Sequence, residues 1–322
     1  MIHRIPSGTR DVLPDEMREL RALTDRLHTV FDQAGYGEVY TPALEYETTF
    51  ERAESYTPRP AYRMFDEAGN VLVLRPDMTV PIARLVATRY PHAEPPLRFS
   101  YFAHAYRGVR PQRGQSRELL QAGIELVGAP GPAGTAEALT VMCSALDAAG
   151  LKTYKVGLGD ASLYPALLEA VGVEAEQREQ ILAELVSGDF VGVERELTEL
   201  QLPDDQLQLL LRVPQMRGGP ELLHELTGPL QAAGTGMLDV QTLLPPSVAE
   251  RIIFDFGLVR NLNYYTGAVF QVYDPAYGVP IGSGGRYDEL LGHFGRPLPA
   301  VGFALNVERV HIALTGEERI GA

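Results

Sequence analysis

Residues 97–107 read LRFSYFAHAYR and residues 118–127 read ELLQAGIELV, and these two segments determine the architecture of the chain. In the first segment, Leu97, Phe99 and Tyr101 begin an alternation of period two, which is typical of a strand with one buried face. The loop between the segments is rich in glycine, proline and arginine. Two strands joined by such a loop are expected to pair antiparallel and to form a platform.

Helix and strand signals alternate on both sides of this platform. Apolar residues recur at three- and four-residue spacing between Pro14 and Gly35, which predicts a helix. Further helices are predicted at 79–90, at 136–149 and from about Leu305, and strands at 36–41, 62–65, 71–75, 154–158, 252–259 and 264–273. The glycines of 282–285 are interpreted as a turn.

Residues 160–247 differ from the rest because they are rich in Leu, Glu, Gln and Ala and contain few aromatic residues. We interpret them as short helices that form a small unit. The chain is therefore expected to be α+β, with an antiparallel sheet flanked by helices, formed by residues 1–159 and 248–322, and a helical insertion at 160–247. The length of 322 residues also favours two packing units.

Composition argues against several classes of protein. The 28 Lys and Arg against 42 Asp and Glu give a net charge of −14, which opposes binding to RNA. Cys143, the single cysteine, lies in an apolar helical run and is expected to pack in the core. The seven histidines lack the spacing of metal ligands, so no metal site is expected. No signal peptide and no apolar stretch of 18 residues occurs, which predicts a soluble, cytoplasmic protein with no membrane contact.

Polar residues gather at the ends of predicted strands. Asp77 and Thr79 lie at a strand-to-helix junction, where they could bind an ammonium group or only cap the helix. Arg107 ends the first platform strand, where its guanidinium group could bind a carboxylate or belong to a solvated loop. Each cluster has both a binding and a purely structural interpretation.

Two further clusters lie on predicted strands. Gln121 and Glu125 are four residues apart, so both point to one face of their strand. If that face is buried, they require a ligand or water; if it faces solvent, they carry no information. The segment VRNLNYYTG (259–267) contains Arg260, Tyr264 and Tyr265, and adjacent tyrosines on a strand would point to opposite faces.

Six blocks in order carry a resemblance to a known family. They are GTRDVLP (8–14), RPDMT (75–79), YRGVRPQRG (106–114), LVR with YYTG (258–260 and 264–267), GGRYD (284–288), and GFA with ER (302–304 and 308–309). Together they resemble the catalytic core of histidyl-tRNA synthetases over nearly the whole chain. The resemblance implies the class II aminoacyl-tRNA synthetase fold, which is usually dimeric.

The chain departs from this family at the nucleotide end. The family carries a glutamate that reads adenine two residues after the motif arginine, whereas this chain has Val109 there. It carries glycine where this chain has Asn306, although Asn tolerates unusual φ angles. The family's usual Glu is replaced by Asp77. An anticodon-binding domain, on the order of 100 residues, is not expected after Arg309.

The amino-acid end keeps its polar groups. By resemblance, Asp77, Thr79 and Gln121 would hold the α-amino group, Glu125 and Tyr264 would face the imidazole, Tyr265 would line the pocket, and Arg260 and Arg107 would approach the carboxylate. This combination resembles the regulatory subunits of ATP phosphoribosyltransferase. It implies a non-catalytic protein without a cofactor, which binds L-histidine and forms a homodimer within a larger hetero-oligomer with the short catalytic subunit. It also implies allosteric feedback control of the first step of histidine biosynthesis, without tRNA.

Two alternatives remain open at this stage. A shortened synthetase-like enzyme could activate an amino acid for an acceptor other than tRNA, since Arg107, Arg260 and Arg309 could still hold a triphosphate. A scaffolding paralogue could retain a vestigial pocket. Val109 and Asn306 favour the regulatory interpretation over the enzyme. The retained polar set favours it over the scaffold, because an empty buried polar pocket is costly.

Overall fold

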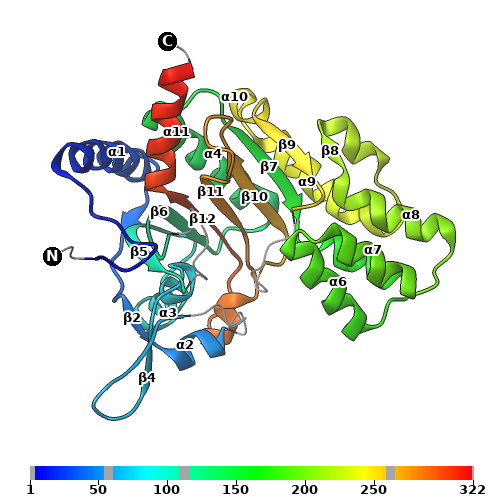
Figure 1. The fold of residues 1–322 in the computed structure, drawn as a ribbon, viewed down its shortest axis with the longest axis horizontal. Helices are drawn as coiled ribbons and strands as arrows, with labels where there is room; N and C mark the ends of the chain where they lie inside the picture. The colour runs from blue at the N-terminus through cyan, green and yellow to red at the C-terminus, as the bar shows by residue number, and fades with distance from the viewer. Residues whose placement is uncertain (1–3, 54–60, 109–115, 259–264, 321–322) are drawn as a thin grey trace.

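The computed structural model describes residues 4–53, 61–108, 116–258 and 265–320 of the chain. Within them, nine strands form one sheet in the order β1-β5-β6-β12-β11-β10-β7-β9-β8 (Figure 1). The strands are β1 (Gly37–Glu38), β5 (Leu97–Tyr106), β6 (Glu118–Val127), β7 (Lys155–Asp160), β8 (Arg217–Gly218), β9 (Ile252–Asp255), β10 (Ala268–Tyr273), β11 (Gly282–Arg286) and β12 (Ala300–Asn306). The predicted platform is confirmed, because β5 and β6 pair antiparallel along their full length.

The sheet is mixed, whereas the sequence predicted an antiparallel one. β1 runs parallel to β5, and β7 runs parallel to β9. Parallel neighbours need a long crossover connection. Residues 161–251 form that connection between β7 and β9, so the helical segment is the physical reason for the parallel pair.

Three helices cover one face of the sheet: α1 (Pro14–Gln33), α4 (Gly131–Ala149) and α11 (Val307–Ile320) (Figure 1). α1 buries Leu20, Leu23, Leu27 and Phe31, as its spacing predicted. Cys143 of α4 is buried in the same core, and burial raises the pKa of its thiol to about 11. Among the described helices, none is long and apolar enough to cross a membrane.

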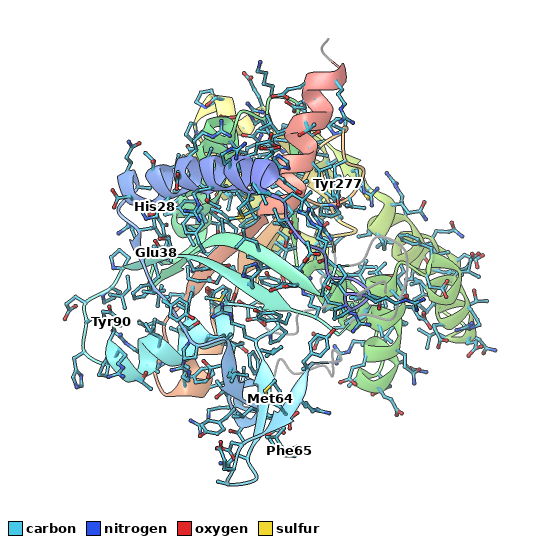
Figure 2. All side chains as sticks on the ribbon, turned by 60° about the vertical axis from the view of Figure 1, so that its left-hand side comes forward. His28, Glu38, Met64, Phe65, Tyr90 and Tyr277 are labelled. Carbon is cyan, nitrogen blue, oxygen red and sulfur yellow. The ribbon has the colours of Figure 1, made fainter. Side chains whose placement is uncertain are left out.

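The opposite face of the sheet is covered by a second layer. This layer contains α2 (Glu47–Arg52), α3 (Thr79–Arg89), the short helix η4 (Leu290–Phe294) and a three-stranded sheet of β2 (Leu44–Tyr46), β4 (Val71–Leu74) and β3 (Arg63–Phe65). The Arg84 guanidinium of α3 donates through Nε to both carboxylate oxygens of buried Glu45, at 3.1 and 3.0 Å. This ion pair ties the small sheet to α3. Met64 and Phe65 lie on that small sheet, on the side of the molecule away from α1 (Figure 2).

The helical segment lies at the other end of the large sheet from β1. It contains α5 (Leu163–Ala170), α6 (Ala175–Ser187), α7 (Phe190–Glu199), α8 (Asp204–Arg212), α9 (Gln231–Leu243), α10 (Pro246–Ala249) and the short helices η1 (Val213–Gln215), η2 (Pro220–Glu225) and η3 (Gly228–Leu230). It also contributes β8, which pairs with β9, so it is not purely helical. One buried cluster runs from α1 into α9, and the division into two units stays a prediction.

One prediction for the C-terminal part is wrong, because residues 282–285 form the strand β11 rather than a turn. The helix predicted from about Leu305 is present and begins at Val307, after the strand β12. A Cβ atom at Gly284 would lie 2.2 Å from the Gly302 carbonyl oxygen and 2.6 Å from the Phe270 ring. Neighbouring groups cross directly over this strand, and only glycine leaves room for them.

Other elements differ only at their ends. The strand predicted at 36–41 is reduced to Gly37–Glu38, the strand predicted at 252–259 ends at Asp255, and the one predicted at 264–273 begins at Ala268. α4 begins at Gly131 rather than at Ala136. Pro132 suits the first helical turn, because the N–H that proline lacks has no intrahelical partner there.

Candidate functional site

Two glycines on neighbouring strands of the large sheet lie beside Glu125 at the candidate site. Glu125 of β6 lies opposite Gly302 of β12, which in turn lies opposite Gly285 of β11. A Cβ atom at Gly302 would come within 1.8 Å of Glu125 Oε2, and one at Gly285 within 2.6 Å of the Tyr265 ring. The two glycines therefore make room on one face for the carboxyl group and for the aromatic ring.

Glu125 is the buried acid of this face, with 2% of its surface exposed. Thr79 Oγ1 donates a hydrogen bond of 2.7 Å to one of its oxygens, and the Tyr287 hydroxyl donates to the other. Burial raises the pKa of Glu125 to about 8, the charge of Asp77 adds to the rise, and the two hydroxyl donors oppose it. The carboxyl group therefore keeps its proton at neutral pH and can share it with a basic atom of a ligand.

Gln121 lies on the same face of β6 and is also buried, with 8% exposed. It pairs with Ala103 of β5 and with Asn306 of β12. Its buried Oε1 atom has no hydrogen-bond partner among the described residues. Leaving a buried acceptor unsatisfied costs about 1–3 kcal/mol, so this oxygen suits a donor supplied by a ligand. Of the two alternatives left open for Gln121 and Glu125, the structure shows the buried one.

Asp77 and Thr79 have different roles, although the sequence presented them together. Asp77 Oδ1 accepts a hydrogen bond of 3.1 Å from the Val80 N–H, so it caps the start of α3. Thr79 instead directs its hydroxyl to Glu125. Asp77 therefore makes the capping contact, and its role toward a ligand stays a prediction, while the Thr79 hydroxyl contacts the buried acid of the candidate site. Asp77 still lies close enough for its charge to raise the pKa of Glu125.

Two tyrosines line the face. Tyr101 of β5 is buried and passes over Gly123, which lies between Gln121 and Glu125 on β6, and its hydroxyl donates to the Phe303 carbonyl at 3.4 Å. Burial and the charge of Glu125 raise the pKa of Tyr101. Tyr265 is half-buried and precedes β10 rather than lying in it, and the expectation for the adjacent tyrosines also involves Tyr264, which lies outside the described residues.

Arg107 lies at the far end of the β5–β6 hairpin. Its side chain is half-buried, and its main-chain N–H donates to the Arg117 carbonyl at 2.8 Å. It follows Ala103, the partner of Gln121, by four residues, or roughly 13 Å along the strand. The assignment of Arg107 to a ligand therefore stays a prediction. Arg260, Tyr264 and Val109 lie outside the described residues.

Two arginines of the quoted motifs and Asn306 are engaged within the chain. Arg75 donates to the carbonyls of Thr41 and His104, at 2.6 and 2.9 Å. Arg286 donates to the Ala129 carbonyl at 2.7 Å. Asn306 Oδ1 accepts a hydrogen bond of 2.9 Å from the main-chain N–H of Arg309, which caps α11. This carboxamide oxygen therefore points to its own helix.

The sequence interpretation missed four contributors to the site. Tyr287 follows Arg286 in GGRYD, and Tyr101 belongs to the quoted β5 segment, yet neither was assigned a role. Gly285 and Gly302 also belong to quoted motifs. The available signal was the alternation of β5 and β6, because it places Tyr101 on the same face as Glu125 once the strands are paired.

Known proteins resemble this chain over nearly its whole length. The histidyl-tRNA synthetase family profile matches residues 8–310. The ATP phosphoribosyltransferase regulatory subunit of Symbiobacterium thermophilum is 41% identical, over 99% of this chain and 81% of the relative. A Bacillus halodurans structure, described as an ATP phosphoribosyltransferase regulatory subunit/histidyl-tRNA synthetase, is 33% identical with a TM-score of 0.89, over 98% of this chain and 84% of that one. A histidine–tRNA ligase subunit of Alicyclobacillus acidocaldarius is 32% identical with a TM-score of 0.81, over 99% of both chains.

Proposed function

Because this chain belongs to the histidyl-tRNA synthetase family, and within it to the ATP phosphoribosyltransferase regulatory subunits, we propose that it binds L-histidine and regulates a catalytic partner without catalysing a reaction itself. The partner is the short-form catalytic subunit of that transferase, which performs the first step of histidine biosynthesis in the cytoplasm. Histidine regulates it only if it favours one state of the complex over another.

The observation that carries this proposal is the buried polar face of β6. Gln121 offers an acceptor to the α-amino group, and Glu125 offers a shared proton to the imidazole ring. Because the usual pKa of histidine is about 6.5, the free ring is mostly neutral at pH 7, where Glu125 is protonated. The Glu125 carboxyl group can then donate a hydrogen bond to an unprotonated ring nitrogen of the imidazole.

The remaining contacts of the ligand follow from the family resemblance. We assign Asp77 and Thr79 to the surroundings of the ammonium group, and Tyr264 and Tyr265 to the imidazole side. Arg260 and Arg107 are assigned to the carboxylate. Arg107 directly follows the end of β5.

The proposal includes self-association of the regulatory subunit. On the small sheet, Tyr46, Leu72 and Met64 lie opposite one another and share one side, and Leu44 lies on the same side two residues before Tyr46. Tyr46 is 51% exposed, and Leu44 is 42% exposed. A largely uncharged apolar surface of this kind suits contact with a second copy. Light scattering at micromolar concentration is expected to give the mass of a dimer or a larger assembly.

Mixing this protein with a short-form catalytic subunit tests the proposal. We expect a complex by size-exclusion chromatography, a higher transferase rate than that of the catalytic subunit alone, and a lower rate when histidine is added. Separate elution at micromolar concentration would refute the assignment of the partner.

Histidine-dependent exchange between ATP and pyrophosphate separates this function from an amino-acid-activating enzyme. We expect no exchange above background, with an active histidyl-tRNA synthetase as the positive control. Exchange at a comparable rate would show that the protein activates histidine.

A further inference from the structure

The helical segment holds most of the net charge of the protein. Residues 160–247 contain 15 acidic and four basic residues, a net charge of −11, whereas the other 234 residues together carry −3. A charge imbalance confined to one part of a protein produces a directed field that attracts partners of opposite charge. The segment also lies at the opposite end of the large sheet from β1 (Figure 1).

The arginines of this segment are already engaged with acidic groups. Arg178 pairs with Glu169 at 3.5 Å, Arg195 with Glu196 at 3.0 Å, and Arg217 with Asp255 at 2.9 Å. The outer surface consequently has an excess of carboxylates. Exposed acidic residues of this segment include Glu174, Glu176, Glu179, Asp189, Glu194, Glu199, Asp204 and Asp205.

Apolar side chains are exposed among these carboxylates at the start of α7. Phe190 is 47% exposed and Val191 is 76% exposed. Val193 and Leu197, further along the helix, fill the core instead. Glu194 lies three and four residues after the exposed pair and so shares their side of the helix. An aromatic anchor bordered by charged groups is the usual composition of the centre of a protein interface.

We propose that the exposed start of α7, formed by Asp189, Phe190, Val191 and Glu194, is where the catalytic subunit docks. This inference rests on the proposed function, and it requires the partner to present a basic surface with an apolar recess. Charge excludes the other occupants. A second copy would bring −11 against −11, and nucleic acid would bring phosphates against carboxylates.

The first residues of the helical segment lie next to the candidate site. The Ala161 N–H donates to the Gly267 carbonyl at 2.9 Å, two residues after Tyr265. Thr266, between them, accepts a hydrogen bond of 3.0 Å from the Asp288 N–H, and Asp288 follows Tyr287. A partner bound to this segment is therefore connected through two hydrogen bonds to the chain that carries two residues of the site.

Charge reversal on α7 tests the proposal in the full-length protein. We expect Glu194→Lys/Glu199→Lys to weaken binding of the catalytic subunit at least tenfold at low salt, and Val191→Ser to weaken it severalfold. The matched control, Asp25→Lys/Asp32→Lys on the exposed side of α1, changes the charge equally and is expected to stay within twofold of wild type. Binding of the wild type is expected to weaken as salt rises, and the α7 variant is expected to lose much of this salt dependence.

The outcomes separate the two proposals. If wild type binds but the α7 variants bind equally well, the catalytic subunit docks elsewhere and the proposed function stands. If the variants instead lose self-association by light scattering, α7 is an interface between copies and the docking proposal is wrong. If wild type forms no complex at all, both proposals fail. Unchanged circular dichroism and histidine binding show that each variant is folded.

Discussion

The face of β6 and the helical segment use acidic side chains in opposite ways. On the sheet, the Glu125 carboxyl group accepts hydrogen bonds from two hydroxyl groups and packs over Gly302, and burial keeps it protonated. On the helical segment, carboxylates stand in solvent and act through their summed charge. The first arrangement is specific for a small ligand that supplies a few matched atoms. The second attracts a large partner and specifies little by itself, so it needs an apolar anchor.

This contrast predicts that the two regions can be disabled separately. Variants of the sheet face should lose histidine binding and keep the complex with the catalytic subunit. Variants of α7 should lose the complex with the catalytic subunit and keep histidine binding. If one surface substitution abolished both histidine binding and the complex, the two functions would not be separated between these two regions.

The largest effect is expected for Glu125→Gln. An amide has one acceptor oxygen where the carboxyl group accepts from both Thr79 and Tyr287, so one hydroxyl donor loses its partner. The amide N–H is also a weaker hydrogen-bond donor to the imidazole than the carboxyl O–H. Calorimetry is expected to show histidine binding weakened at least 100-fold, or about 3 kcal/mol. Binding of the catalytic subunit is expected to stay within twofold of wild type, and a matched loss there would contradict the division.

A smaller effect is expected for Gly302→Ala. The added methyl group would occupy the position of a Glu125 oxygen, so either the carboxyl group or the strand must move. We expect the free energy of unfolding to fall by about 1–3 kcal/mol and histidine binding to weaken as well. Gly236→Ala in α9 is the control, because no atom lies within 4 Å of the added Cβ. It is expected to be neutral or stabilising. Equal urea midpoints for the two variants would show that stability does not depend on having glycine at position 302.

The pH dependence of stability distinguishes the buried acid from the exposed ones. Folding raises the pKa of Glu125 from 4.5 to about 8, so between these values the folded state holds a proton that the unfolded state has released. The contribution of this group is therefore fully present below about pH 4.5, is lost as the pH rises to about 8, and is constant above that. Its slope reaches about 1.4 kcal/mol per pH unit. Urea unfolding of wild type and Glu125→Gln should differ by this slope, and parallel curves would contradict the buried, protonated state.

The smallest effect is expected for Asn306→Ala. Its carboxamide oxygen caps α11, so the substitution is expected to cost about 1 kcal/mol of stability and to leave histidine binding unchanged. Asp189→Ala removes the equivalent cap of α7, a bond of 2.9 Å to the Gly192 N–H, and is expected to cost a similar amount in thermal unfolding. A loss of histidine affinity in Asn306→Ala alone would place this side chain in the ligand site.

The sequence predicted the platform and its polar face because both follow from alternation. Once β5 and β6 were expected to pair, Gln121 and Glu125 had to share a side, and the structure shows that this side is buried. The helices with strong apolar spacing, such as α1, were also predicted correctly.

The errors arose where tertiary contacts override local preference. A run of glycines usually marks a turn, but in β11 it makes room for rings and carbonyl groups from neighbouring strands. Asp77 and Thr79 are two residues apart, and no local signal indicates that one caps α3 while the other donates to Glu125. Such roles depend on which strand packs against these residues in the folded protein, and a single sequence does not contain that information.

Isothermal titration of L-histidine into the full-length protein, without ATP or tRNA, tests the account most directly. We expect saturable binding to one site per chain, with release or uptake of heat that Glu125→Gln abolishes. Injection heats equal to those of buffer alone, in wild type at neutral pH, would show that the polar face of β6 is not a histidine site.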